Sequence, residues 1–170
     1  MEKYSKKFVA LHWIHALILL FLLIGASLNL PDLPEVSGDL KPFKMHIIIG
    51  VVAIFLLISR LILVTKEPKF KLYDNSKEIL VKWNHRLIYL VILITGASGI
   101  AMAKISNLGE VAVFGAEQKI YSGKSDTVEL FANIHDISTN ILIALIAMHI
   151  IGIVLYTIQT KKKIIKRMWF

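Results

Sequence analysis

The six histidines are the residues of this 170-residue chain with the clearest capacity for chemistry. A neutral imidazole is the commonest metal ligand in proteins, and it also gives and takes protons near neutral pH. All six lie within or at the ends of strongly apolar segments: His12, His15, His46, His85, His135 and His149. A single buried histidine is usually a structural hydrogen-bonding residue, but the confinement of all six to apolar segments indicates a functional role.

Four apolar segments carry these histidines, and we expect each to form a membrane-spanning helix. The segments cover residues 8–30, 45–64, 86–103 and 133–158, close to or above the roughly 20 residues that cross a bilayer. The hydrophobic fraction of 56% argues against a soluble domain and against disorder. The first segment is longer than a signal-peptide core, so we retain it as a span. The expected fold class is an all-α, integral membrane four-helix bundle that forms one domain over residues 1–170.

The loops divide the charges unequally between the two ends of this bundle. The N-terminus, the second loop and the C-terminal tail, counted with Arg60 and Arg86, hold 15 of the 20 basic residues and 4 of the 12 acidic ones. By the positive-inside rule both termini are expected in the cytoplasm, and nucleic acid is not an expected partner. We expect residues 31–43 to be non-helical because they contain helix breakers, namely Pro31, Pro34, Gly38 and Pro42.

The direction of each helix divides the histidines between two depths. The first helix starts in the cytoplasm and places His12 near the inner face, whereas the second returns and places His46 near the outer face. His135 and His149 are 14 residues apart, which puts them on one helix face and about 21 Å apart in depth. Two pairs of facing imidazoles predict two haems stacked along the bundle axis. His12 and His149 would bind the inner iron, and His46 and His135 the outer iron.

Two arginines are candidates for binding the propionate groups of the inner haem. Arg60 follows His46 by 14 residues, so it lies on the same helix face near the inner level. Arg86 lies at the inner end of the third span. A planar guanidinium suits a carboxylate, although contact with lipid headgroups is the alternative for each arginine taken singly. Glycines in the spans either make room for a macrocycle or serve plain helix packing: Gly25, Gly50, Gly96, Gly99 and Gly152.

Two histidines remain for a second task at the inner end. A quinone pocket needs a polar residue that holds a carbonyl oxygen and passes protons, with aromatic side chains beside the ring. His85 and His15 are the candidate catalytic residues of such a pocket, with Trp13 and Trp83 available beside them. Ordinary helix-end polarity and an interfacial aromatic belt are the alternative, and we favour the belt for the tryptophans.

Four stretches of sequence resemble, in order, the four spans of the prokaryotic cytochrome b561 family. They are LHWIHA with His12, MHIIIG with His46, HRLIYL with His85, and IHDISTNILIALIAMH with His135 and His149. The resemblance covers nearly the whole chain, and it implies the same two pairs of haem ligands. It also implies two haems b, exchange with ubiquinone or another quinone, and electron passage between the periplasmic side and the quinone in the bacterial cytoplasmic membrane.

Two functions follow from this resemblance. Some short family members oxidise superoxide and reduce ubiquinone, which makes a quinone-linked oxidoreductase with a periplasmic-side donor the first hypothesis. Others are membrane anchors and electron conduits for a partner dehydrogenase or hydrogenase. The outer loops are net negative, which argues against a surface that collects superoxide. A metal transporter is disfavoured because the span interiors hold almost no carboxylates, and the absence of cysteine excludes iron–sulfur and thiol chemistry.

Overall fold

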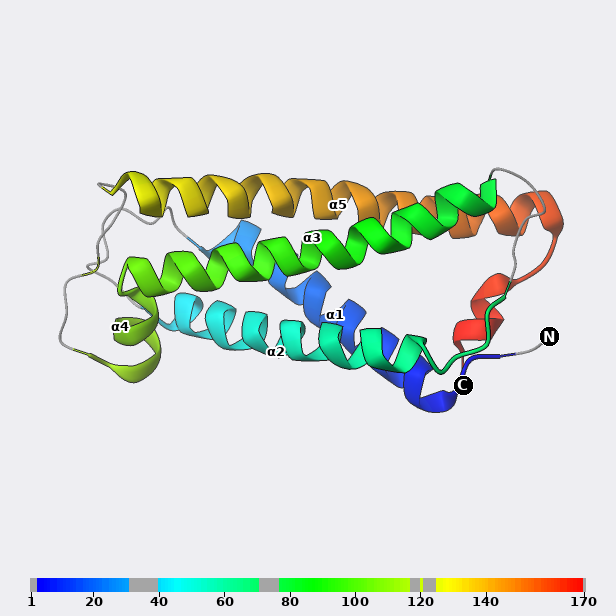
Figure 1. Cartoon of the computed structure of the whole chain (residues 1–170), viewed down its shortest axis with the longest axis horizontal. Helices are drawn as coiled ribbons and strands as arrows, with labels where there is room; N and C mark the ends of the chain where they lie inside the picture. The colour runs from blue at the N-terminus through cyan, green and yellow to red at the C-terminus, as the bar shows by residue number, and fades with distance from the viewer. Residues whose placement is uncertain (1–2, 31–39, 71–76, 117–119, 121–124, 170) are drawn as a thin grey trace.

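Four long helices lie along a common direction and form an elongated bundle (Figure 1). They are α1 (Lys6–Asn29), α2 (Lys41–Val64), α3 (Lys77–Ile105) and α5 (Asp126–Thr160). The computed structural model describes residues 3–30, 40–70, 77–116, 120 and 125–169. The first and last described residues lie at the same end of the bundle, which we call the inner end (Figure 1). A short helix, α4 (Leu108–Phe114), lies at the opposite, outer end, and a 3-10 helix, η1 (Ile164–Met168), lies near the inner end.

The expected all-helical membrane bundle is confirmed. Each long helix contains a window apolar enough to cross a bilayer, with a mean hydropathy between 1.9 and 3.0. Only 17–22% of each window is buried inside the bundle, so most of the aliphatic side chains point outward. Lipid tails are as apolar as leucine, so such side chains are stable where lipid covers them. The described part of the chain contains helices and no strand.

The helices extend beyond the apolar segments from which we expected them. Helix α3 begins at Lys77 and α5 at Asp126, and helix α4 lies between the third and fourth apolar segments. The expectation that Pro42 lies in a non-helical loop is wrong, because this proline occupies the first turn of α2. Proline is tolerated there, since a backbone N–H at that position has no acceptor within the helix. The other three helix breakers, Pro31, Pro34 and Gly38, lie outside the described residues.

Hydrogen bonds at the inner end join α1 to distant parts of the chain. The Ser5 hydroxyl accepts a hydrogen bond from the Phe8 backbone N–H at 3.3 Å and so caps α1. The Glu67 carboxylate, just beyond α2, accepts hydrogen bonds from the Ser5 backbone N–H at 2.9 Å and from the Ser5 hydroxyl. The Trp13 indole N–H donates to the Met168 carbonyl oxygen at 2.6 Å. The C-terminal 3-10 helix therefore folds back against the start of α1.

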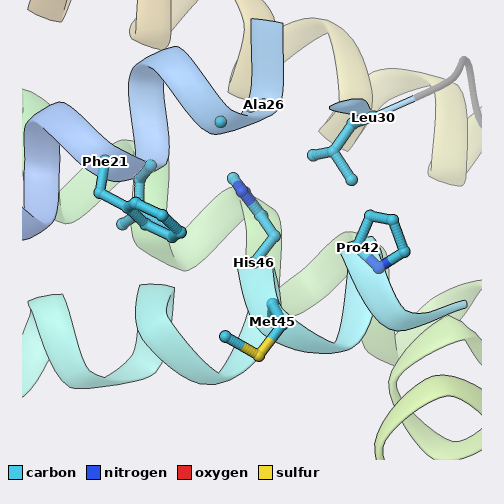
Figure 2. Close-up of a pocket in the computed structure, with 8 residues that line it drawn as sticks. Phe21, Ala26, Leu30, Pro42, Met45 and His46 are labelled. Carbon is cyan, nitrogen blue, oxygen red and sulfur yellow. The ribbon is translucent and has the colours of Figure 1, made fainter. Parts of the chain in front are cut away.

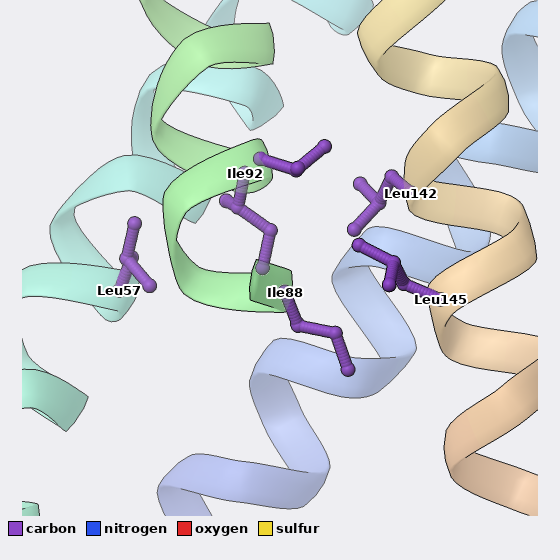
Figure 3. Packing of buried hydrophobic residues seen from close by; sticks show 6 residues of the cluster. Leu57, Ile88, Ile92, Leu142 and Leu145 are labelled. Atoms are coloured by element: carbon purple, nitrogen blue, oxygen red, sulfur yellow. The ribbon is translucent and has the colours of Figure 1, made fainter. Parts of the chain in front are cut away.

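Aliphatic side chains from α2, α3 and α5 fill the middle of the bundle (Figure 3). The buried members of this aliphatic core are Leu57, Ile88, Val91, Ile92, Leu142 and Leu145. Leu142 lies midway between His135 and His149 along α5. Close packing, rather than exclusion of water, holds such a core together within a membrane. The aliphatic core thus separates an outer polar level from an inner one.

Candidate functional site

The outer polar level brings together His46 of α2 and His135 of α5. Their ring centroids lie 6.1 Å apart with the ring planes at 75°. A metal–imidazole nitrogen bond is about 2 Å long, so two imidazoles on opposite sides of one metal have ring centres about 6 Å apart. The two rings are therefore spaced as axial ligands of one iron would be.

One hydrogen bond determines which nitrogen of His135 is free to bind a metal. The Nδ1 atom lies 2.9 Å from the Thr95 carbonyl oxygen. Because a carbonyl oxygen only accepts, Nδ1 carries the proton and donates it. The Nε2 atom then keeps its lone pair, and this is the tautomer that ligates a metal while the other nitrogen binds the backbone.

A cavity of about 210 Å³ lies between α1 and α2 beside His46 (Figure 2). Figure 2 shows the His46 imidazole reaching from α2 toward α1. The cavity is lined by Phe21, Leu22, Gly25, Ala26, Leu30, Pro42, Met45 and His46. A Cβ atom added at Gly25 or at Gly50 would have no neighbour within 4 Å. Gly25 lines the cavity, so its missing side chain adds to the apolar space beside the His46 imidazole.

The inner polar level contains four histidines. The ring centroids of His85 and His149 lie 4.9 Å apart, with the planes at 89°. His12 and His15 lie in the first half of α1, at the same end of the bundle. Nδ1 of His12 and both ring nitrogens of His15 are buried without a hydrogen-bond partner. Buried polar atoms are almost always satisfied in native proteins, so these nitrogens indicate polar groups of a bound molecule.

Arg60 adds a buried cation to the inner level. The side chain is only 9% exposed, and its Nε has no hydrogen-bond partner. Its guanidinium carbon lies 5.8 Å from the ring centroid of Phe8 and 5.3 Å from that of Tyr89. No carboxylate of the described residues forms an ion pair with it. A buried charge is costly without a counter-charge, so Arg60 is suited to the carboxylate of a bound group.

The remaining predicted residues lie nearer the surface. The Arg86 side chain is exposed, and its guanidinium carbon lies 5.6 Å from the ring centroid of the half-exposed Trp83. Trp13 lies beside His12, with 5.4 Å between the ring centroids. Tyr4, which the sequence analysis did not single out, precedes α1. Burial raises the pKa of its phenol above the ordinary 10.0, so the phenol stays neutral at physiological pH.

Several polar residues near the histidines were missed by the sequence reasoning. Thr95, Ser98 and Ser138 surround His135, and Asn84 at the inner level has a buried Oδ1 without a partner. The run of small and hydroxyl residues at 95–99 in an otherwise aliphatic span was the available signal.

A comparison with known protein families shows which family has this arrangement of helices and histidines. The family model described as prokaryotic cytochrome b561 matches residues 3–170. The chain belongs to the prokaryotic cytochrome b561 family. It is therefore a multi-pass bacterial membrane protein and a b-type haem cytochrome that takes part in electron transfer. No curated protein matches the chain.

The described residues of this cytochrome b561 fit haem b. Haem iron takes imidazole ligands on its two faces, and His46 and His135 are spaced for that task. The macrocycle needs apolar space, and the cavity beside His46, which Gly25 lines, supplies part of it. The propionates need cations, and Arg60 is a buried cation that has no carboxylate partner among the described residues. Among the described residues, no three His, Asp or Glu side chains cluster as a directly bound metal ion would require.

Proposed function

We propose that this cytochrome b561 carries electrons from a donor on the periplasmic side to a quinone in the membrane through two bis-histidine haems b. His46 and His135 bind the outer iron, and His12 and His149 bind the inner iron. When bound, the haems supply one-electron redox chemistry, while the protein sets their spacing and access. The observation that carries the proposal is the separation of two imidazole levels by the aliphatic core around Leu142.

The side chains between and around the two levels support this function. The aliphatic core keeps water and protons out of the space between the levels. Arg60 neutralises a propionate of the inner haem, since its guanidinium is buried and lacks a carboxylate partner. Both termini lie in the cytoplasm, as the excess of basic residues at the inner end implies. The inner level then faces the cytoplasmic leaflet, and the donor enters at the outer level.

A visible spectrum with haem quantification tests the proposal directly. The protein purified from haem-replete cells is expected to contain two haems b per chain and to show b-type bands on reduction. The pyridine haemochrome assay measures the stoichiometry. A colourless preparation, or one haem per chain, would overturn the two-haem arrangement.

His85 and His15 form the quinone site at the inner level. Nδ1 of His85 donates a hydrogen bond to the Val81 carbonyl oxygen at 2.7 Å, which leaves the lone pair on Nε2. That nitrogen is able to take up a proton and deliver it to a quinone oxygen as the quinone is reduced. His15 is fully buried on α1, and its unpartnered ring nitrogens supply a second hydrogen-bonding group.

Replacing His85 by alanine is expected to slow quinone reduction while both haems remain bound. Positioned acid–base groups contribute about 10²–10⁴-fold to rate, so a loss on the order of 10²-fold is expected. Stopped-flow oxidation of the pre-reduced protein by a soluble quinone measures the rate. Lys82→Ala is the control, because Lys82 is exposed on the same helix and pairs with Glu78. An unchanged rate in His85→Ala would remove His85 from the quinone site.

A second candidate function is that of a membrane anchor and electron conduit for a partner dehydrogenase or hydrogenase. The observation that favours it is Phe114 of α4, which is 83% exposed at the outer end. The net negative charge of the outer loops also disfavours superoxide as the donor. A partner that co-purifies stably would select the conduit, whereas turnover of superoxide and quinone by the isolated protein would select the oxidoreductase.

A further inference from the structure

A hydrogen-bonded network of side chains joins α3 to α5 around His135. The Thr95 carbonyl oxygen accepts from Nδ1 of His135 at 2.9 Å and from the Ser98 hydroxyl at 2.9 Å. The Ser98 oxygen lies 3.4 Å from the same Nδ1. The Ser138 hydroxyl donates to the His135 carbonyl oxygen at 3.0 Å and lies 2.8 Å from the Thr95 hydroxyl. Ser98 and Ser138 are buried, so no bulk water replaces these contacts.

Gly99 gives the His135 ring its place beside α3. A Cβ atom at Gly99 would lie 3.0 Å from Cε1 and 3.1 Å from Nδ1 of His135. Real Cβ atoms rarely come that close, so any larger residue would push the ring away from α3. The missing side chain therefore allows Nδ1 to reach the Thr95 carbonyl oxygen.

We propose that Thr95, Ser98 and Gly99 are positioning residues that act through His135 to set the reduction potential of the outer haem. This inference rests on the proposed function, because it requires His135 to bind that haem. A hydrogen bond donated by Nδ1 makes the imidazole a stronger electron donor, which stabilises ferric iron and lowers the potential. The strength of the bond to the Thr95 carbonyl thus controls the potential.

Ser98 weakens that bond by sharing its acceptor. Two donors, the Ser98 hydroxyl and the His135 Nδ1–H, withdraw electron density from the same Thr95 oxygen. Without the hydroxyl, the carbonyl oxygen is a better acceptor for the imidazole alone. The native serine therefore holds the outer haem at a higher potential than an apolar residue would.

A potentiometric titration of the Ser98→Ala holoprotein tests this role. The outer haem is expected to shift to a more negative midpoint potential, with the inner haem unchanged and both haems bound. Ser98→Thr keeps the hydroxyl and is expected to restore the native potential. Ser27→Ala is the control, since that hydroxyl donates only to the Leu23 carbonyl oxygen of its own helix. An unchanged or raised outer potential in Ser98→Ala overturns the proposal.

Gly99→Ala provides a second readout that does not depend on Ser98. The displaced ring is expected to change the low-spin ferric EPR signal of the outer haem together with its potential. Gly152→Ala is the matched control, because Gly152 is exposed on α5 and a Cβ there meets nothing within 4 Å, so we expect both EPR signals to be native. A native outer EPR signal in Gly99→Ala also overturns the proposal.

The His46→Ala variant assigns the two titration waves, so that failure of the positioning role can be told apart from failure of the proposed function. That variant lacks the outer haem, so its remaining titration wave identifies the inner one. If the native protein holds fewer than two haems, the proposed function fails. If it holds two haems and either Ser98→Ala or Gly99→Ala leaves the outer haem unaltered, the positioning role alone fails.

Discussion

Replacing His46 by alanine is expected to lower the haem content from two per chain to one, and the remaining haem is the inner one. The His46 ring lies 6.1 Å from that of His135, and the two supply the outer ligand pair. The substitution removes one of the two imidazoles that would bind the outer iron, so this haem would be bound less tightly. Pyridine haemochrome quantification measures the content, and a potentiometric titration shows which wave has disappeared.

The surroundings of His46 offer both a control and a rescue experiment. Met45→Ala changes a neighbouring side chain that lines the same cavity, and it is expected to retain two haems. Free imidazole is expected to restore the outer haem of His46→Ala, because the deleted side chain leaves a space of the size of an imidazole next to the iron position. A His46→Ala protein that keeps two haems with native spectra would refute the outer pair.

Replacing His12 by alanine is expected to remove the inner haem and leave the outer one. This variant tests whether His12 is the partner of His149. His85 is the alternative partner, because its ring centroid lies 4.9 Å from that of His149. His12 carries a buried Nδ1 without a hydrogen-bond partner. We therefore expect one haem per chain in His12→Ala. The control is His15→Ala, a substitution one turn along the same helix, and we expect two haems per chain in it.

The rate of quinone reduction extends this second test. In His12→Ala the outer haem is expected to remain reducible, but quinone reduction falls to the rate measured without protein, because no redox group bridges the inner level. Stopped-flow traces at the outer haem band separate the two steps. Two haems in His12→Ala combined with one in His85→Ala would make His85 the partner of His149, and His85 would then lose its quinone role.

Much of the architecture was predictable because a membrane imposes few choices on a chain. A backbone in lipid must satisfy its own hydrogen bonds, so each long apolar segment becomes a helix. The position of a residue along a straight helix follows from its number, so His135 and His149 share one face. Even the level of each histidine follows once the helices alternate in direction.

The helix ends were less predictable, because polar residues beyond the bilayer core form helix as readily as loop. Pro42 illustrates the difficulty, since a proline breaks a helix interior but starts a helix well. Helix α4 was not predicted, because the hydrophobic periodicity of seven residues is too short to distinguish a helix from a loop. Leu108 and Ala112 are buried against α2, which shows that tertiary packing supports this helix.

Hydropathy and helical period are local properties, so the residues alone predicted the four spans, the two levels of histidine and the resemblance to a haem-binding family. The contacts between side chains of different helices were visible only after folding, because the rotation of each helix depends on how its neighbours pack. Thus Nδ1 of His135 binds the carbonyl of Thr95, 40 residues away, and His149 contacts His85. Arg60 is buried while Arg86 is exposed for the same reason, although both lie near the inner ends of apolar segments.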